Sequence, residues 1–278
     1  MKLKIFLLAA VALLTACSEG STPINTDNEH DPITSATEKT QETEMFEEGT
    51  KEPPAEASSA ADFEYELYEA ENFGTAVAIT GYTGSLPEVT IPGDIEGCPV
   101  RKIGDSAFKE NDGITSVIIP DGVTEIEYDA FYKCTGLTSV NIPDSIVKIS
   151  GFAFSNCTGL TSVVIPDSVT WIGSAAFGGC TALTSVVISN SVTEIGNSTF
   201  SGCTALTFVI IPDSVIEIGS YAFSDCTALT YLFIPNSVAE IGISAFSNCP
   251  DLTIQCRSGS AAEQYAVEND IPCTYIQD

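Results

Sequence analysis

Residues 160–182 read LTSVVIPDSVTWIGSAAFGGCTA, and this pattern returns every 23 residues along most of the chain. The period is strictest at one aromatic position and one thiol position of the unit. The aromatic position is held by Phe108, Phe131, Phe154, Phe177, Phe200, Phe223 and Phe246. The thiol position is held by Cys134, Cys157, Cys180, Cys203, Cys226 and Cys249. A regular period of this length predicts a solenoid, in which each coil of the chain stacks on the coil before it.

Each unit divides into two halves with different patterns. The first half, residues 160–165, is rich in Thr, Val and Ile and predicts a short strand. Pro166 ends that strand, because proline has no N–H to donate to a sheet. The second half, residues 169–180, brings apolar side chains back to the axis of the stack. Stacking would pair the first-half strands in parallel in one sheet, about 4.8 Å apart.

The repeat is similar to the BspA-like leucine-rich repeats of bacterial surface proteins. The shared motif is L-T-S-V-x-I-P-D-S-V-x-x-I-G-x-x-A-F-x-x-C-T, and it covers residues 86–252. Departures are local: Ser189 replaces the proline of one unit, and five extra residues lengthen the first unit around residues 96–99. The resemblance implies a leucine-rich-repeat solenoid, non-catalytic, with roles in adhesion and in contacts with a host or with neighbouring cells.

Both ends of a solenoid need caps, because the core is otherwise exposed there. Residues 63–85 contain a strand-and-turn pattern that predicts an N-terminal cap. Residues 253–278 predict a C-terminal cap, with a short helix at 260–269 and a strand at 271–276. This ending is similar to the terminal cap of the same family.

The first 16 residues predict a signal peptide, with two lysines followed by an apolar run that is too short to span a bilayer. The run ends in Leu14-Thr15-Ala16-Cys17, which resembles the lipobox of bacterial lipoproteins. In that family the cysteine thiol is acylated and the chain is cut just before it. The resemblance implies a membrane anchor at Cys17 and a place in the cell envelope, on the extracytoplasmic side. Ordinary secretion, with Cys17 uninvolved, is the alternative.

Residues 17–62 predict a disordered acidic tether that follows the lipidated cysteine. Twelve acidic residues stand against Lys39 and Lys51 after position 17, with few large apolar side chains. Such a composition cannot offset the loss of chain entropy by burial. His30, the single histidine, lies in this segment, where no fixed geometry supports catalysis.

Charge and composition exclude several classes of function. The formal net charge of −28 makes nucleic-acid binding unfavourable, because phosphate backbones repel such a chain. A single histidine excludes most triads, dyads and multi-histidine metal sites. A carboxylate-based hydrolase remains an alternative, but no pair of acidic residues stands out from the repeat. We expect no enzyme activity, no cofactor and no metal.

The cysteines divide into a column and a pair. Stacked thiols about 4.8 Å apart suit neither disulfides nor a tetrahedral metal site, so the column predicts small buried apolar groups. Cys256 and Cys273 lie outside the column, on elements that look adjacent in the cap, and exported proteins meet an oxidising environment. We predict a disulfide between them. Cys98 has no obvious partner.

The residue after the proline position of each unit forms an acidic or amide column. Its members are Asp121, Asp144, Asp167, Asn190, Asp213 and Asn236. The predicted role is to cap a turn by accepting hydrogen bonds from backbone N–H groups. Calcium binding is the alternative, because neighbouring carboxylates about 4.8 Å apart repel each other.

The outward positions of the predicted strands carry the candidate ligand-binding surface. Phe208, Ile210, Tyr231 and Phe233 fall on two neighbouring coils, and the same outward columns contain Val164 and Val187. Exposed aromatic side chains in one patch indicate recognition, unless the cap covers them. The sequence therefore predicts a surface module that binds an extracellular protein or glycan. A scaffolding lipoprotein within the envelope is the alternative.

Overall fold

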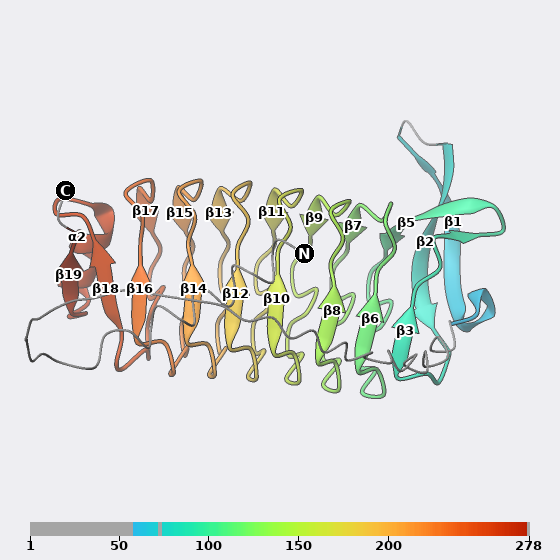
Figure 1. Cartoon of the computed structure of the whole chain (residues 1–278), viewed down its shortest axis with the longest axis horizontal. Helices are drawn as coiled ribbons and strands as arrows, with labels where there is room; N and C mark the ends of the chain where they lie inside the picture. The colour runs from blue at the N-terminus through green and yellow to red at the C-terminus, as the bar shows by residue number, and fades with distance from the viewer. Residues whose placement is uncertain (1–57, 72–73, 277–278) are drawn as a thin grey trace, which may run out of the picture. The chain divides into compact units, whose positions relative to one another are not determined.

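The computed structural model describes residues 58–71 and 74–276, all within one compact unit, Glu52–Asp278. The predicted signal peptide, Cys17, His30 and most of the predicted tether lie outside the described residues. Within them, the chain winds into coils that stack along one axis, as Figure 1 shows. Successive coils match residue for residue at an offset of 23, so that Ser162 pairs with Ser185. The predicted solenoid of 23-residue units is confirmed.

The first strand of each coil forms one column along the stack. Its members are β3 (Glu88–Thr90), β6 (Ser116–Ile118), β8 (Ser139–Asn141), β10 (Ser162–Val164), β12 (Ser185–Val187), β14 (Phe208–Ile210) and β16 (Tyr231–Phe233). The middle residue of each strand points into the core, and the flanking residues point outward, as in Phe208, Val209 and Ile210. Neighbouring strands pair in parallel, and the ladder is interrupted between β8 and β10 and between β14 and β16.

A second column of strands, which the sequence did not predict, runs beside the first (Figure 1). Its members are β5 (Cys98–Ile103), β7 (Glu125–Ile126), β9 (Lys148–Ile149), β11 (Trp171–Ile172), β13 (Glu194–Ile195), β15 (Glu217–Ile218) and β17 (Glu240–Ile241). From β7 onward each strand has only two residues. The expectation of one sheet is thus corrected. Each second half also extends briefly before it turns back, and it pairs in parallel with the next coil except between β11 and β13.

A turn segment closes each coil and forms a third ladder of inter-coil hydrogen bonds. Phe131 N donates to Ala153 O over 2.7 Å, and Lys133 N donates to Ser155 O over 2.8 Å. Two residues of each such segment adopt left-handed backbone, one on each side of the core phenylalanine. In the coil of Phe177 they are Ala175 (φ 52°) and Gly179 (φ 73°). This backbone turns the chain tightly enough to leave the aromatic ring facing inward.

The core is a row of stacked phenylalanine rings. Successive rings lie 4.8–5.7 Å apart between centroids, with interplanar angles of 3–18°. All seven rings are at most 3% exposed. Each ring therefore covers its neighbours, and no coil buries its apolar face by itself.

The N-terminal end is covered by an antiparallel pair, β1 (Phe63–Ala70) and β2 (Gly74–Tyr82). β2 continues in parallel onto β5, and Phe63 and Tyr82 pack on Phe108, the first ring of the row. The short helix η1 (Ala60–Asp62) precedes β1, and Ser58 accepts a hydrogen bond from Thr90 N. Residues 58–62, which the sequence assigned to the tether, are thus ordered against the first coil.

The five extra residues of the first coil form a hairpin. β4 (Asp94–Ile95) pairs antiparallel with β5, and Glu96 and Gly97 turn between them with φ values of 54° and 78°. Two left-handed residues in succession are what a tight hairpin turn requires.

The C-terminal end is covered by β18 (Thr253–Cys256), α2 (Ala261–Glu268) and β19 (Cys273–Tyr275). Ser260 caps α2 by accepting a hydrogen bond from Glu263 N over 3.2 Å. The helix places Tyr265 edge-on against Phe246, the last ring of the row, at 5.7 Å and 77°. Among the described residues, no helix has the length and apolar character needed to cross a bilayer.

Candidate binding surface

The predicted aromatic patch lies on the outer face of the first strand column. Phe208, Ile210, Tyr231 and Phe233 are 36%, 48%, 48% and 37% exposed. The residues between them, Val209 and Leu232, point into the core. The strand alternation that buries Val209 and Leu232 therefore forces these four large side chains into solvent.

The C-terminal cap does not cover the patch. β18 pairs beside β16 in the same column, with Thr253 opposite Tyr231 and Gln255 opposite Phe233. The cap thus extends the strand face instead of folding over it. The sequence left open whether the cap covers these rings, and within residues 58–71 and 74–276 nothing does.

The apolar surface continues toward the N-terminal coils in one register column. Ile210 lies next to Val187 of β12, which in turn lies next to Val164 of β10. Val164 is 43% exposed, and Val187 is partly buried. The sequence reasoning therefore placed all six of its candidate ligand-binding residues on one face.

No outward residue of the first-column strands β10, β12, β14, β16 and β18 carries a charge. Their side chains are only Ser, Thr, Gln, Val, Ile, Phe and Tyr, in a chain whose formal net charge is −28. Partial burial raises the pKa of Tyr231, so its phenol stays protonated and can donate a hydrogen bond. Depletion of charge with enrichment in aromatic residues is the composition of an interface core.

Comparison with known proteins places these coils in a family. The model of the BspA type leucine rich repeat region matches six copies, over residues 101–227 and 193–265. These ranges together span more than half of the chain. The chain belongs to the BspA type leucine-rich-repeat family. Proteins built from such repeats are generally non-catalytic scaffolds, so this BspA-type protein is a protein-binding or structural module.

Two solved structures are similar to this BspA-type protein. A leucine-rich repeat protein of T. pallidum has 28% identity and a TM-score of 0.65, over 78% of this chain and 98% of that chain. A leucine rich cell surface protein of Faecalibacterium prausnitzii has 39% identity and a TM-score of 0.63, over 73% of this chain. The match spans about half, 55%, of the F. prausnitzii chain. No curated protein matches the chain significantly.

The thiol column of the BspA-type repeats has a structural role. Each thiol donates a hydrogen bond to the carbonyl of the core phenylalanine one coil earlier, as Cys180 Sγ does to Phe154 O over 3.2 Å. Burial raises the pKa of Cys134 and Cys203 to about 12 and that of Cys249 to about 11. Thiols that stay protonated are poor nucleophiles and poor metal ligands.

The predicted disulfide pair lies in the cap, on neighbouring strands. Cys256 of β18 and Cys273 of β19 have sulfur atoms 3.0 Å apart, and both groups are thiols. Adjacent parallel strands therefore bring the two sulfurs within reach of a bond. The disulfide stays a prediction that oxidation of the protein would test.

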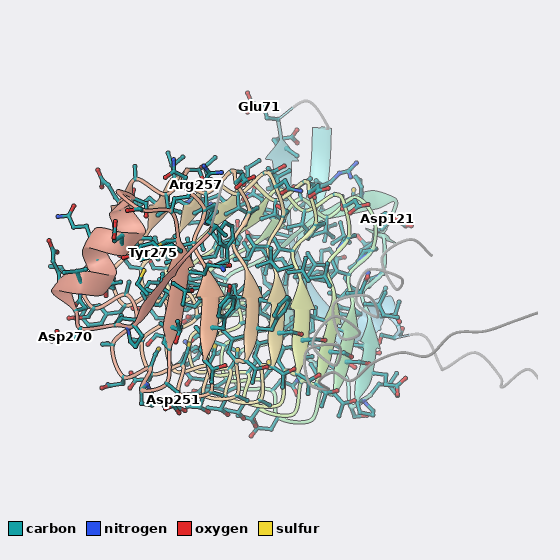
Figure 2. All side chains as sticks on the ribbon, turned by 60° about the vertical axis from the view of Figure 1, so that its left-hand side comes forward. Glu71, Asp121, Asp251, Arg257, Asp270 and Tyr275 are labelled. Carbon is teal, nitrogen blue, oxygen red and sulfur yellow. The ribbon has the colours of Figure 1, made fainter. Side chains whose placement is uncertain are left out.

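The acidic column does not cap turns as predicted. The turns are closed by the main chain instead, with Val169 N donating to Pro166 O over 3.0 Å. The column residues project into solvent, as Asp121 does in Figure 2. Within the part of the chain that the structure describes, no group of three His, Cys, Asp or Glu side chains converges on a possible metal position.

A second group of aromatic residues, the exposed Tyr128 and Phe152 with the half-buried Tyr132, lies on the turn segments. Sequence reasoning missed it because only the strand positions were examined for outward side chains. The signal was present: at positions 128 and 152, bulky rings interrupt repeat columns that hold mostly small or polar residues.

Proposed function

We propose that this protein is a lipid-anchored recognition module of the bacterial cell surface, which binds an extracellular protein or glycan through the strand face and catalyses no reaction. The observation that carries the proposal is the uncharged strip around Phe208, Tyr231 and Phe233. The exposed part of these aromatic side chains contributes nothing to the stability of the fold. They are, however, the residue types that dominate binding energy at interfaces.

A protein partner suits this surface better than a glycan does. The strip is open and apolar, and the pockets at the C-terminal cap and at the turn segments of Tyr128 and Phe152 do not include its residues. Large flat apolar contact is typical of protein–protein interfaces, whereas small ligands prefer concave sites. The F. prausnitzii relative is described as a cell surface protein, which supports the proposed location.

The anchor and the tether complete the proposal. Acylation at Cys17 would hold the module at the membrane, and the acidic residues up to position 57 would hold it away from the lipid surface. Labelling with radioactive palmitate tests this part, because a Cys17→Ala variant should lose the label. Retention of the label by the variant would reject lipidation at that residue.

The triple variant Phe208→Ser, Tyr231→Ser and Phe233→Ser tests the strand face. It should lose capture of extracellular matrix proteins and of neighbouring cells while its circular dichroism spectrum stays unchanged. The matched control is Trp171→Ser with Ile216→Ser, since these side chains are 42% and 56% exposed on or beside the second column. Equal capture by wild type and triple variant would reject this face.

A scaffold within the envelope is the second candidate, favoured by the stacked and rigid architecture. Protease treatment of intact cells separates the two. A surface module should release a fragment that contains the repeats, whereas an internal scaffold should stay protected until the envelope is broken.

A further inference from the structure

The turn segments of the first three coils, those of Phe108, Phe131 and Phe154, form a shallow pocket on a different part of the surface from the strand face. Its volume is about 470 Å³, and Tyr128, Tyr132 and Phe152 supply its aromatic side chains. Lys109, Asp129 and Asn156 supply polar groups. Such a pairing of flat rings with convergent polar groups is typical of a small-molecule or sugar site.

The fold alone gives the ring of Phe152 little benefit. Phe152 has left-handed backbone, with φ of 56°, and is 41% exposed. Bulky residues adopt this conformation at a cost, and an exposed ring recovers little of that cost by burial. The equivalent residues of most other coils are small or polar, as Asp129, Ala175 and Ser198 are. Phe152 is therefore better explained by a contact outside the chain than by folding.

A glycine makes room for the second ring. A Cβ atom at Gly151 would lie 2.9 Å from the ring of Tyr128, which is closer than packed atoms allow. The φ of Gly151 is not in the left-handed region, so the backbone itself does not require glycine there. Because Gly151 has no side chain, the ring of Tyr128 can lie across this coil, where its centroid is 6.4 Å from that of the Phe152 ring. Tyr128 is 52% exposed there.

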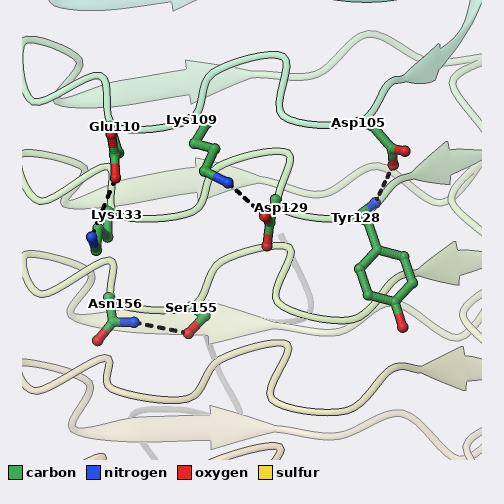
Figure 3. A network of polar contacts seen from close by, with 8 residues as sticks. All are labelled: Asp105, Lys109, Glu110, Tyr128, Asp129, Lys133, Ser155 and Asn156. Carbon is green, nitrogen blue, oxygen red and sulfur yellow. Dashed lines mark hydrogen bonds and ion pairs between the residues drawn. The ribbon is translucent and has the colours of Figure 1, made fainter.

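The polar groups of the pocket are held by contacts with one another and with neighbouring side chains, of which Figure 3 shows the Lys109–Asp129 and Asn156–Ser155 pairs. Lys109 Nζ contacts Asp129 Oδ2 at 2.8 Å and lies 5.1 Å from the centroid of the Tyr132 ring. Asn156 Nδ2 donates to Ser155 Oγ over 3.1 Å. Pre-organised donors and acceptors lose less entropy when a ligand binds.

The charged groups of the pocket favour a neutral ligand over an ionic one. Lys109 and Asp129 neutralise each other within the pocket, and the chain as a whole repels anions. An ionic ligand therefore has no unpaired opposite charge to meet there. A neutral sugar ring has apolar C–H faces for the two exposed rings and hydroxyl groups for the carboxylate, the ammonium and the amide.

We propose that this pocket binds a pyranose unit of a neutral glycan, with Tyr128 and Phe152 stacking on the sugar and Lys109, Asp129 and Asn156 bonding its hydroxyl groups. The site is independent of the strand face. A cell-surface protein with both surfaces would hold a protein partner and a glycan at the same time.

Saturation-transfer NMR with the full chain tests the site directly. The probes are maltotriose, cellotriose, chitotriose, mannotriose and lactose, which together present the common neutral hexopyranoses. At least one should receive saturation from the protein. The double variant Tyr128→Ala and Phe152→Ala should weaken its binding about tenfold or more, since two aromatic contacts are lost.

The control variant is Tyr221→Ala, because Tyr221 is also exposed, with φ of 58°, at the position equivalent to Phe152. It should bind as wild type does, as should the strand-face triple variant. Gly151→Ala keeps every contacting group and displaces only the Tyr128 ring, so it should weaken binding without loss of fold. Absence of transfer to every probe would overturn the proposal, and so would equal binding by the wild type and the double variant.

Discussion

The carbonyl oxygen of each core phenylalanine explains why the column beside it is made of cysteine. Phe131 O accepts one hydrogen bond from Cys134 N at 3.1 Å and a second from Cys157 Sγ at 3.0 Å. The second donor comes from the next coil, so the thiol joins coils as well as filling space. A thiol is small, weakly polar and tolerant of burial, which neither alanine nor serine combines.

The raised pKa of these thiols predicts a loss of stability at alkaline pH. An unfolded cysteine ionises near ~8.5, whereas burial raises the pKa of Cys134 and Cys203 to about 12. The folded state thus holds protons that the unfolded state releases. Each buried thiol therefore makes its full contribution to the free energy of unfolding below pH ~8.5. This contribution falls as the pH rises toward the pKa of the folded state, by on the order of 1 kcal/mol per pH unit for each thiol.

Guanidinium unfolding under reducing conditions, at pH values between about 7 and 9.5, measures this effect, the upper value lying above the unfolded thiol pKa. Cys203→Ala removes one of the titrating groups. The variant should be less stable than wild type at neutral pH, and its stability should fall less steeply above pH ~8.5. Parallel stability profiles for the two proteins would contradict the assignment of the pH dependence to buried thiols.

At the scale of the element, a helix and a strand of the C-terminal cap take the place of a further repeat. They cover the last core ring and continue the first strand column. α2 supplies Tyr265 to cover Phe246, and β19 continues the first column beyond β18. Tyr275 Oη donates to Glu263 Oε1 over 2.6 Å, which ties β19 to the helix (Figure 2 shows Tyr275). This hydrogen bond lowers the pKa of Glu263 and raises that of Tyr275 to about 12.

Oxidation should lock this cap. A bond between Cys256 and Cys273 would close a loop of 17 residues, which stabilises a protein by about 3 kcal/mol in the chain-entropy model. Non-reducing peptide mass spectrometry of the exported protein should find the linked pair, and Cys273→Ala should lower the melting temperature only under oxidising conditions. Two free thiols in the exported protein would reject the bond.

The sequence predicted best those features of the fold that depend on a residue repeated in every coil. The phenylalanine column predicted the core, because a ring that returns at every period has to face one axis. The second strand column escaped prediction because pairs such as Glu125–Ile126 are too short to show alternation. The pocket of Tyr128 and Phe152 escaped it for the opposite reason, since a repeat pattern hides the residues that depart from it.

At the scale of the whole molecule, stability is shared between neighbouring coils. Each ring of the phenylalanine row from Phe131 to Phe223 stacks on the ring before and the ring after it. Interactions of this kind make a solenoid behave as a one-dimensional chain of coupled units. The effect of a core substitution on stability therefore depends on its position along the stack as much as on the volume that it removes.

Phe177→Ala and Phe246→Ala test this coupling with the same chemical change. Both remove a ring that is at most 3% exposed, which costs about 3–5 kcal/mol in a packed core. Phe177 has stacked rings on both sides, whereas Phe246 has one stacked ring and the edge of Tyr265. Loss of Phe177 should uncouple the two halves, and loss of Phe246 should loosen only the last coil and the cap.

Hydrogen exchange read by mass spectrometry resolves the two outcomes coil by coil. In Phe177→Ala, exchange should accelerate in the strands of several coils on both sides of β10 and β12. In Phe246→Ala, faster exchange should be confined to β16, β18 and α2, while the N-terminal coils keep wild-type protection. If both variants lost protection uniformly from β3 to β19, the stack would unfold as a single all-or-none unit, and nearest-neighbour coupling would not describe it.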